Sequence, residues 1–230
     1  KVTSTVGDTE TSDTHGRAIK MVKFHPDMHM LTEFTAGTLP LAQSACVSIH
    51  LTFCSKCREL SEAQTAVAAT LFEELEPAPV SDSQLDIVMS RLDETAPLVY
   101  PRENRSQTCS TPAILQRLMA GDYSDLSWKK ITSNLRISYL STGDPYYEFA
   151  LYHIKAGGVI PEHNHRGSEM TLVLEGGFSD SNGTYLAGDF LFREAGDVHA
   201  PTALADEDCI CLAVLDAPLS FTRLKHKWMN

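Results

Sequence analysis

The sequence has no long hydrophobic run and is short of positive charge. No apolar stretch approaches the roughly 20 residues of a membrane-spanning helix, and the N-terminus lacks the basic-then-apolar order of a signal peptide. These two absences predict a cytoplasmic protein that does not enter a membrane. Lysine and arginine total 19 against 30 aspartates and glutamates, a net charge of −11. That balance argues against direct DNA binding and is compatible with a basic protein partner.

Large apolar side chains are nearly missing from the first 20 residues, "KVTSTVGDTETSDTHGRAIK". Such a segment cannot bury enough surface to offset the entropy of ordering it. We therefore expect residues 1–20 to be a disordered leader or an expression remnant. The whole chain, 43% hydrophobic and 21% charged, has the composition of a globular protein and the length of one large domain or two small ones.

Residues 21–95 show helical periodicity. "HPDMHMLTEFTAG" has Pro26 where a helix can begin, which places His25 near the N-cap, and Gly37 where the helix would end. The next two segments, "LPLAQSACVSIHLTFC" and "CRELSEAQTAVAATLFEEL", also repeat apolar residues with a helical period. In the second segment the repeating residues are Leu60, Ala63, Val67, Leu71 and Leu75. The pattern predicts a bundle of three short helices.

A fourth helix is predicted after the proline-rich "EPAPV", in "SDSQLDIVMSRLDE", with Ser81 or Asp82 as its cap. It can stand apart from the other three. Its apolar stripe is then a candidate for contact with a partner, although the same stripe could pack on the bundle. The residues of the stripe are Leu85, Val88, Met89 and Leu92.

The stretch "IHLTFCSKC" contains His50, Cys54 and Cys57 in the spacing H-x3-C-x2-C. Thiolates and imidazoles are ligands that suit Zn²⁺. A small helical domain needs a bound metal to stabilise it, because its hydrophobic core is small. A structural zinc site has four ligands, so a fourth must come from elsewhere. His25 and His29, one helical turn apart, are the candidates. The alternative is a pair of buried thiols beside an exposed histidine.

The second half of the chain changes to the pattern of β-strands. Residues 96–125 are expected to be a linker with a short apolar helix around 114–119. From residue 126 to 230, short alternating or apolar runs are separated by Gly, Asn and Asp, which predicts a small antiparallel barrel or jelly roll. The expected fold class is therefore α+β and multidomain, with an N-terminal helical bundle followed by an antiparallel β-barrel.

A second group of metal-binding residue types lies in this β-rich region. His163 and His165 alternate on one strand and so share a face, Glu169 follows, and His199 comes after a later turn. Three imidazoles and a carboxylate that converge in a barrel would bind Zn, Fe, Mn or Ni. Histidines on the surface near a turn are the alternative. For an enzyme, the available acid or base groups beyond these ligands are Glu162, Arg166 and Tyr185.

The other cysteines and histidines are assigned no metal. In a reducing compartment, free cysteines are ligands or small buried residues rather than disulfide partners. We expect Cys46, Cys209 and Cys211 in the core, and His153 and His226 on the surface or satisfied inside it.

The helical stretch "HPDMHMLTEFTAGTLPLAQSACVSIHLTFCSKCRE" resembles the zinc-binding anti-sigma domain of the ChrR family. In that family an upstream histidine joins the H-x3-C-x2-C motif, and its spacing falls on His25. The later stretches resemble the two cupin motifs. The second motif departs from the pattern with Glu194 in place of proline and Ala203 in place of asparagine. The first is matched in full by Gly157, His163, His165, Glu169 and Gly176.

The resemblance implies an anti-sigma factor that inhibits an extracytoplasmic-function sigma factor and releases it under photooxidative stress, that is, singlet oxygen. It implies Zn²⁺ in the helical domain and a divalent metal, with Zn²⁺ the first choice, in the cupin domain. A helical face could lie between sigma domains, with acidic residues opposing a surface that otherwise meets DNA. Those acidic residues are Glu59, Glu62, Glu73, Glu74, Asp82 and Asp86. The rival hypothesis is a metal-dependent cupin dioxygenase or isomerase with a helical appendage.

Overall fold

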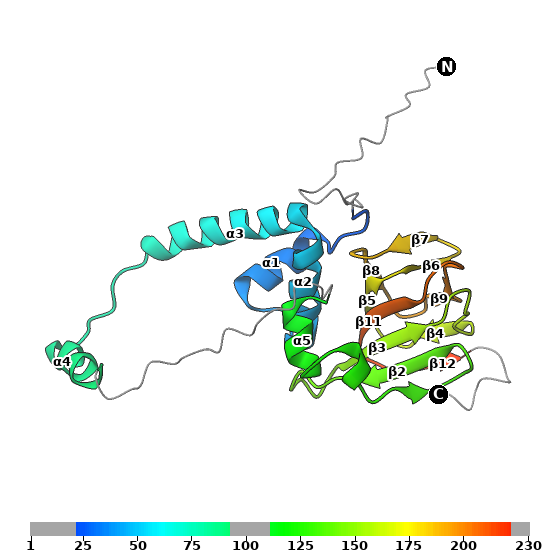
Figure 1. Cartoon of the computed structure of the whole chain (residues 1–230). Helices are drawn as coiled ribbons and strands as arrows, with labels where there is room; N and C mark the ends of the chain where they lie inside the picture. The colour runs from blue at the N-terminus through cyan, green and yellow to red at the C-terminus, as the bar shows by residue number, and fades with distance from the viewer. Residues whose placement is uncertain (1–21, 93–110, 222–230) are drawn as a thin grey trace, which may run out of the picture.

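The computed structural model describes residues 22–92 and 111–221. The expected leader, His226 and the first half of the expected linker (residues 96–110) lie outside the described residues. The helices gather on one side of a β-sandwich, except for a long helix that extends away from it and a separate helix beyond (Figure 1). The helices are α1 (Met28–Ala36), α2 (Leu41–Phe53), α3 (Ser55–Glu73), α4 (Asp82–Arg91), α5 (Ala113–Met119) and the 3-10 helix Tyr123–Asp125.

The first helix begins later than Pro26 suggests. Asp27 is its N-cap, and the Asp27 carboxylate accepts a hydrogen bond from the Met30 amide at 2.7 Å. A side chain that satisfies a free amide of the first turn defines the start of a helix more strongly than a proline does. His25 therefore lies in an extended segment before the helix. Gly37 ends α1 in the left-handed conformation, as predicted.

Cys54 forms the corner between α2 and α3. It is the C-cap of α2 and the N-cap of α3, with an extended backbone between the two helices. Its Sγ atom accepts the Cys57 amide at 3.4 Å, as a capping side chain does. The H-x3-C-x2-C motif thus spans a sharp turn that points its side chains into one space.

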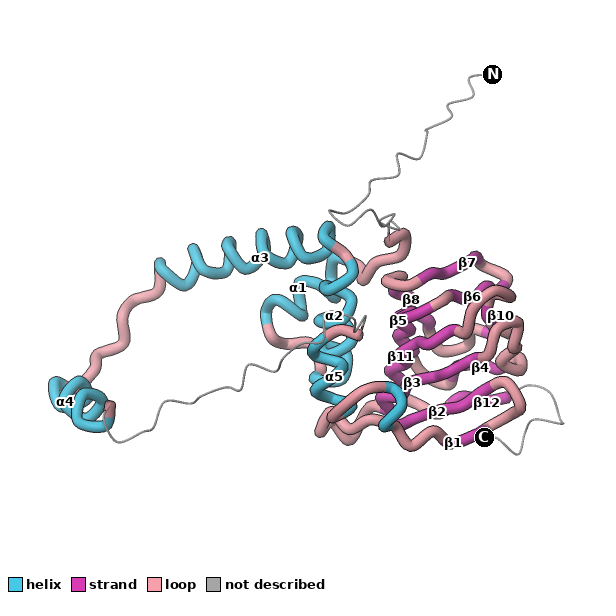
Figure 2. Tube along the Cα trace, in the orientation of Figure 1, coloured by secondary structure: helices cyan, strands magenta, loops and turns pink. Residues whose placement is uncertain are grey.

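The far half of α3 and all of α4 form an extended arm, residues 67–92 (Figure 2). The predicted helices are present, but the apolar repeat of α3 does not pack into a bundle beyond Leu60. Val67, Leu71 and Leu75 are all exposed, because the helix runs past the body of the molecule. The stripe on α4 is exposed too and does not pack on the bundle. Among the helices of the described residues, none combines the length and apolar composition needed to cross a bilayer.

The strands form an antiparallel sandwich. A six-stranded sheet has the order β1-β2-β3-β11-β5-β8, and two three-stranded sheets have the orders β10-β6-β7 and β12-β4-β9. The strands are β1 (Lys129–Lys130), β2 (Leu135–Tyr139), β3 (Glu148–Ile154), β4 (His163–His165), β5 (Glu169–Glu175), β6 (Gly177–Asp180), β7 (Gly183–Leu186), β8 (Phe190–Arg193), β9 (Val198–His199), β10 (Thr202–Ala203), β11 (Cys209–Leu215) and β12 (Leu219–Phe221).

The expected barrel does not close into a continuous hydrogen-bonded ring across the described residues. The chain turns a corner at Gly176, between the end of β5 and the start of β6, and passes from the large sheet to a small one. Gly176 has φ of 63°, and a Cβ there would lie 2.3 Å from the Asp208 carbonyl oxygen. Only glycine combines this conformation with such a close approach. The antiparallel β architecture predicted from the sequence is otherwise present.

The six-stranded sheet is buried on both faces. Along β3, Phe149 and Leu151 face the helices, whereas Ala150 and Tyr152 face the interior of the sandwich. The outer face packs against α1, α2 and α5 in one hydrophobic cluster, so the helical part and the sheet share a core. Leu115 of α5, within the segment expected to be a linker, is fully buried there.

Candidate metal centres

The first group consists of His25, His50, Cys54 and Cys57. One ligand atom from each lies within 4.8 Å of all the others. His25 comes from the extended segment before α1, His50 from the last turn of α2, Cys54 from the corner and Cys57 from the first turn of α3. His25 Nδ1 is 3.4 Å from Cys54 Sγ and 3.5 Å from Cys57 Sγ. The structure therefore joins three separate elements at one point.

The hydrogen bonds of His50 leave one ring nitrogen free for a ligand. Nδ1–H donates to the Gly188 carbonyl oxygen at 2.9 Å, because a carbonyl can only accept. The Nε2 atom then carries a lone pair, and it is buried without a hydrogen-bond partner among the described residues. An imidazole held through its other nitrogen is the usual arrangement of a metal-ligating histidine. The donor set and this orphaned atom fit a bound metal ion.

Burial favours the uncharged forms of His25, His50 and Cys57 when no cation is bound. It lowers the pKa of His50 to about 4 and also lowers the pKa of His25, with nearby Lys56 adding to the effect. Burial, together with the hydrogen bond to Cys54, raises the pKa of the Cys57 thiol to about 12. A metal cation is the partner that would convert buried thiols to thiolates and bind neutral imidazoles.

His29 and Cys46 lie outside this group. The His29 side chain is 82% exposed, and its Nε2 is 3.6 Å from a Glu33 carboxylate oxygen one turn along α1. Cys46 is completely buried in the shared hydrophobic core, which raises its thiol pKa. Of the two candidate histidines, the structure thus brings His25 to the cysteines and leaves His29 in solvent.

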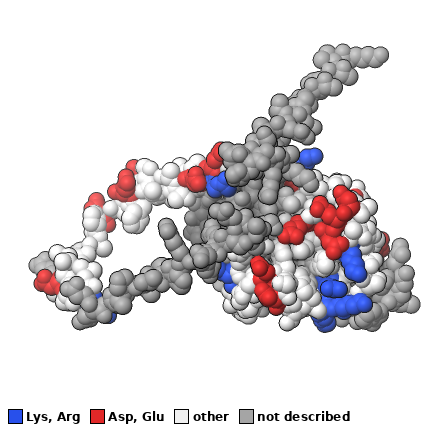
Figure 3. All heavy atoms as spheres, viewed as in Figure 1, with Lys and Arg blue, Asp and Glu red and all other residues white. Residues whose placement is uncertain are grey.

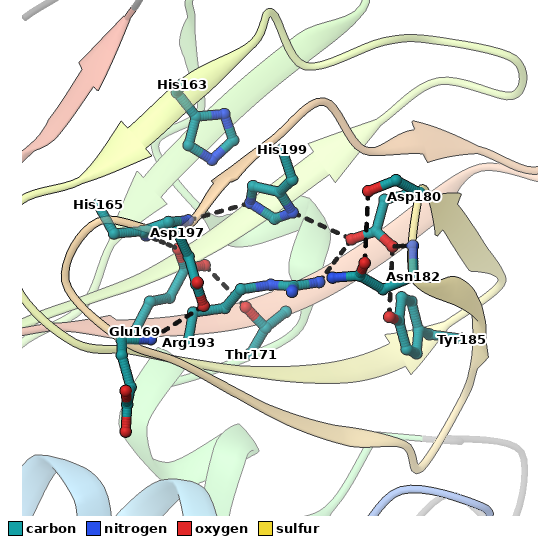
Figure 4. Close-up of polar contacts among 12 residues, drawn as sticks. His163, His165, Glu169, Thr171, Asp180, Asn182, Tyr185, Arg193, Asp197 and His199 are labelled. Carbon is teal, nitrogen blue, oxygen red and sulfur yellow. Dashed lines mark hydrogen bonds and ion pairs between the residues drawn. The ribbon is translucent and has the colours of Figure 1, made fainter.

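The second group consists of His163, His165, Glu169 and His199, all buried, with one ligand atom from each within 4.8 Å of the others. His163 and His165 lie on β4, Glu169 begins β5, and His199 on β9 pairs with His163. His165 Nδ1 is 2.9 Å from Glu169 Oε2, and its Nε2 is 3.1 Å from His199 Nε2. The side chains converge from three strands (Figure 4).

Outer hydrogen bonds orient this second group. His163 Nδ1–H donates to the Pro161 carbonyl at 2.9 Å, and the Thr171 hydroxyl donates to Glu169 Oε1 at 2.7 Å. Burial, and then the neighbouring His199, lowers the pKa of His163 to about 4. Burial alone would raise the pKa of Glu169, but hydrogen bonds from His165 and Thr171 outweigh it and lower that pKa. A carboxylate beside neutral imidazoles suits a divalent cation.

Asp180, at the end of β6, supports His199, and sequence reasoning missed it. Its Oδ2 atom lies 3.1 Å from His199 Nδ1 and also pairs with Arg193. Its Oδ1 atom accepts the Tyr185 hydroxyl at 3.3 Å and the Asn182 amide at 2.8 Å (Figure 4). No motif spacing marks Asp180, because it lies on β6 in one small sheet and His199 on β9 in the other, and only the tertiary fold brings them together. Tyr185, considered above as an acid or base, instead binds this carboxylate.

A small cavity of about 30 Å³ adjoins the second group. A water molecule needs roughly 10–15 Å³ on this measure, so there is room for about two waters. Arg166 is exposed, and neither Arg166 nor Glu162 lines the cavity. Cys211 does line it, and Cys209 and Cys211 are both buried in the core as predicted. In this conformation the site can hold an ion and solvent but not an organic substrate of ordinary size.

His153 lies outside both groups. Its Nε2 is 2.8 Å from an Asp208 carboxylate oxygen, so it is a satisfied histidine at the surface of β3.

Similarity to known proteins extends over most of this chain. Residues 116–217 match the family model of the ChrR cupin-like domain. The anti-sigma-E factor ChrR of Cereibacter sphaeroides is 36% identical over 206 residues, which cover 90% of this chain and 95% of that protein. In the crystal structure of Rhodobacter sphaeroides SigE in complex with the anti-sigma ChrR, a chain matches with a TM-score of 0.74 and 34% identity. The match covers 85% of this chain and 100% of that one. The present chain belongs to the ChrR family of anti-sigma factors.

Proposed function

We propose that this protein is an anti-sigma factor, a regulator and not an enzyme, that binds and inhibits an extracytoplasmic-function sigma factor. The observation that carries the proposal is the arm of residues 67–92, which extends from the body and exposes its apolar side chains. Many large apolar side chains exposed along one segment mark a protein-interaction site in a globular protein. Family membership supports a sigma factor as the occupant, since SigE is the partner in the related complex.

The arm combines apolar and acidic side chains. Its ten large apolar residues are each 50–74% exposed. The same segment has five acidic residues and one arginine, and acidic side chains recur along the arm (Figure 3). An amphipathic helix with this chemistry can lie in an apolar groove with a basic rim, such as a sigma surface that otherwise contacts promoter DNA. Within the arm, we assign the central partner contacts to Leu85, Val88, Met89 and Leu92.

The metal of the first group is Zn²⁺ in this proposal. Two thiolates and two imidazoles at the meeting point of three elements make a closed, four-coordinate structural site. The ion would fasten the extended segment of His25 to α2 and α3. Such a staple supplies folding free energy that the few buried residues of α1 and α3 cannot supply alone.

The second group would hold a divalent metal in the barrel, with Zn²⁺ the first choice. The small cavity supports a sensing or structural role for that metal over the dioxygenase or isomerase alternative. We propose that it reports photooxidative stress by singlet oxygen and that this signal releases the sigma factor in the cytoplasm. A signal can shift the equilibrium between bound and free states only if it interacts differently with them.

The test is co-expression with each extracytoplasmic-function sigma factor of the source organism. We expect a stable one-to-one complex with one of them, carrying zinc, and inhibition of transcription from its promoter in a reconstituted assay. Absence of a complex with every sigma factor, or a complex that leaves transcription unchanged, would overturn the proposal.

A further inference from the structure

Residues 183–193 comprise β7, a turn and β8, and we call them the β7–β8 segment. β7 lies in a small sheet and β8 in the six-stranded sheet, so the segment connects the two. Its turn meets the first group on the helices, and its strands meet the support of His199.

At the helical end, the turn of the β7–β8 segment binds one candidate ligand and the residues that precede another. The Gly188 carbonyl accepts His50 Nδ1–H at 2.9 Å. The buried Asp189 carboxylate accepts the backbone amides of Lys23 and Phe24, at 2.7 and 3.1 Å. The Phe190 amide donates to the Phe24 carbonyl at 3.0 Å. The segment leading directly into His25 is therefore held by hydrogen bonds to this turn.

At the barrel end, β7 and β8 each supply one side chain that holds Asp180. Tyr185 on β7 donates its hydroxyl to Asp180 Oδ1, and Arg193 on β8 pairs with Oδ2. Oδ2 also contacts His199 Nδ1 at 3.1 Å. A change in the orientation of the His199 ring therefore alters the hydrogen bonds that position the β7–β8 segment.

The two ends are joined by tight packing. The Tyr185 ring lies edge-on to the Phe24 ring, with centroids 4.9 Å apart, and Phe24 immediately precedes His25. A Cβ on Gly188 would lie 2.7 Å from the Val22 side chain and 3.1 Å from Phe53 Cβ. Packing this close transmits displacement, because neighbouring groups have no free space to absorb it.

We propose that the β7–β8 segment couples the two groups, so that metal bound at His163, His165, Glu169 and His199 slows the loss of metal from His25, His50, Cys54 and Cys57. This inference rests on the proposed function, in which both groups bind a metal. A metal at the barrel site fixes His199, and through Asp180 and Tyr185 it fixes Phe24 and the turn at Gly188. Without that metal, the outer shell of the helical site is less constrained and holds its metal more weakly.

The experiment measures zinc release from the full chain. Native mass spectrometry first counts the metals in the wild-type chain and in His163→Ala, which removes a barrel ligand but leaves His199, Asp180 and Tyr185 in place. The chromogenic chelator 4-(2-pyridylazo)resorcinol then reports the rate at which the helical site loses zinc. We expect about fivefold faster release in His163→Ala, the lower end of typical couplings. His153→Ala, a barrel histidine outside both groups, is the matched control and should release zinc at the wild-type rate.

A second variant tests the route itself. Tyr185→Phe removes only the hydroxyl that binds Asp180 and keeps the ring against Phe24. We expect it to retain two metals, to release helical zinc faster than wild type, and to show little further change when combined with His163→Ala. If circular dichroism shows that His163→Ala does not fold, the rate of zinc release from Tyr185→Phe is compared with the wild-type rate and decides the question.

The outcomes are distinguishable. A wild-type chain with two metals, together with variants that release helical zinc at the wild-type rate, overturns the coupling and leaves the proposed function intact. A wild-type chain that binds no metal at the barrel site overturns that part of the proposed function and the coupling with it.

Discussion

His50 is buried with its two ring nitrogens in different roles. Nδ1–H binds the Gly188 carbonyl of the barrel, and Nε2 faces His25 and the two cysteines without a hydrogen bond among the described residues. A buried imidazole nitrogen without a partner is costly, so an ion at this point would remove the cost as well as join the elements. At the scale of single residues, the hydrogen bond at His50 Nδ1 thus determines that Nε2 is the nitrogen available to a metal.

We predict that His25→Ala will lose the helical metal and that His29→Ala will keep it. His25 lies 3.4 Å from Cys54 Sγ, whereas His29 is exposed and only pairs with Glu33. Removal of a ligand should weaken metal affinity by more than about 100-fold, the upper range for outer-shell changes. Metal content by mass spectrometry and the melting temperature check this. The opposite ranking of the two variants would move the fourth ligand to His29.

Gly188 is a second critical residue, because it combines φ of 95° with close contacts to Val22 and Phe53. We predict that Gly188→Ala lowers the free energy of unfolding by about 2–6 kcal/mol. Backbone strain contributes about 1–3 kcal/mol of this loss, and overpacking against Val22 and Phe53 contributes about 1–3 kcal/mol.

Gly143→Ala is the matched control for Gly188→Ala. Gly143 has φ of 82° but no atom within 4 Å of the added Cβ, so it reports strain alone. Urea unfolding of the metal-loaded proteins measures both variants. Equal losses of stability would show that contact with the helical segment at Gly188 is unimportant.

Among the elements, α4 contributes little to the fold, because each of its large apolar side chains is at least half exposed. We predict that Leu85→Asp or Val88→Asp weakens sigma binding at least about tenfold, the effect of a central interface residue. The free energy of unfolding should change by less than about 0.5 kcal/mol, as for other surface substitutions. Isothermal titration calorimetry and thermal melts measure the two quantities.

The control for the α4 variants is Tyr146→Asp, which replaces an exposed aromatic residue of the barrel, far from the arm in sequence. Its affinity for the sigma factor should equal that of wild type. Unchanged affinity in both α4 variants would place the partner on another surface.

In the whole molecule, the helical part and the sheet share one hydrophobic core, and the turn between β7 and β8 completes the outer shell of the helical site. We predict that a fragment of residues 21–105 folds only with zinc, binds the sigma factor, and melts below the full chain, because it lacks Phe190 and the Gly188 carbonyl. Calorimetric melts and a binding assay test this. A fragment that carries zinc but does not bind would make the barrel part of the binding surface.

The barrel metal has its own prediction at this scale. If it reports the oxidant, His163→Ala/His165→Ala leaves resting inhibition intact and blocks release of the sigma factor under singlet oxygen. A sigma-dependent reporter, measured with and without photosensitiser and light, gives the answer. Constitutive reporter activity would indicate a structural metal, and a normal response would exclude the sensing role.

Much of the fold follows from local patterns. The helices, the strands and the change of period between them were predicted, because amphipathic repeats and glycine turns act over a few residues. The position of Asp27 as the cap and the exposure of Val67 and Leu71 were not predicted. A helical period shows that one side of a helix is apolar, but not whether that side meets the core or a partner.

By itself the sequence determined the two groups of candidate ligands, since H-x3-C-x2-C and the alternation of His163 and His165 are local spacings that place side chains on one turn or one strand face. The resemblance to the ChrR family already selected His25 over His29, and the tertiary structure placed His25 at the cysteines. Only the tertiary structure joined Asp180 to His199 and set the barrel turn against His50. Those contacts join residues 19 to 138 positions apart, and burial and packing between whole elements decide them. The periodicity of side chains within a single helix or strand cannot predict such a contact.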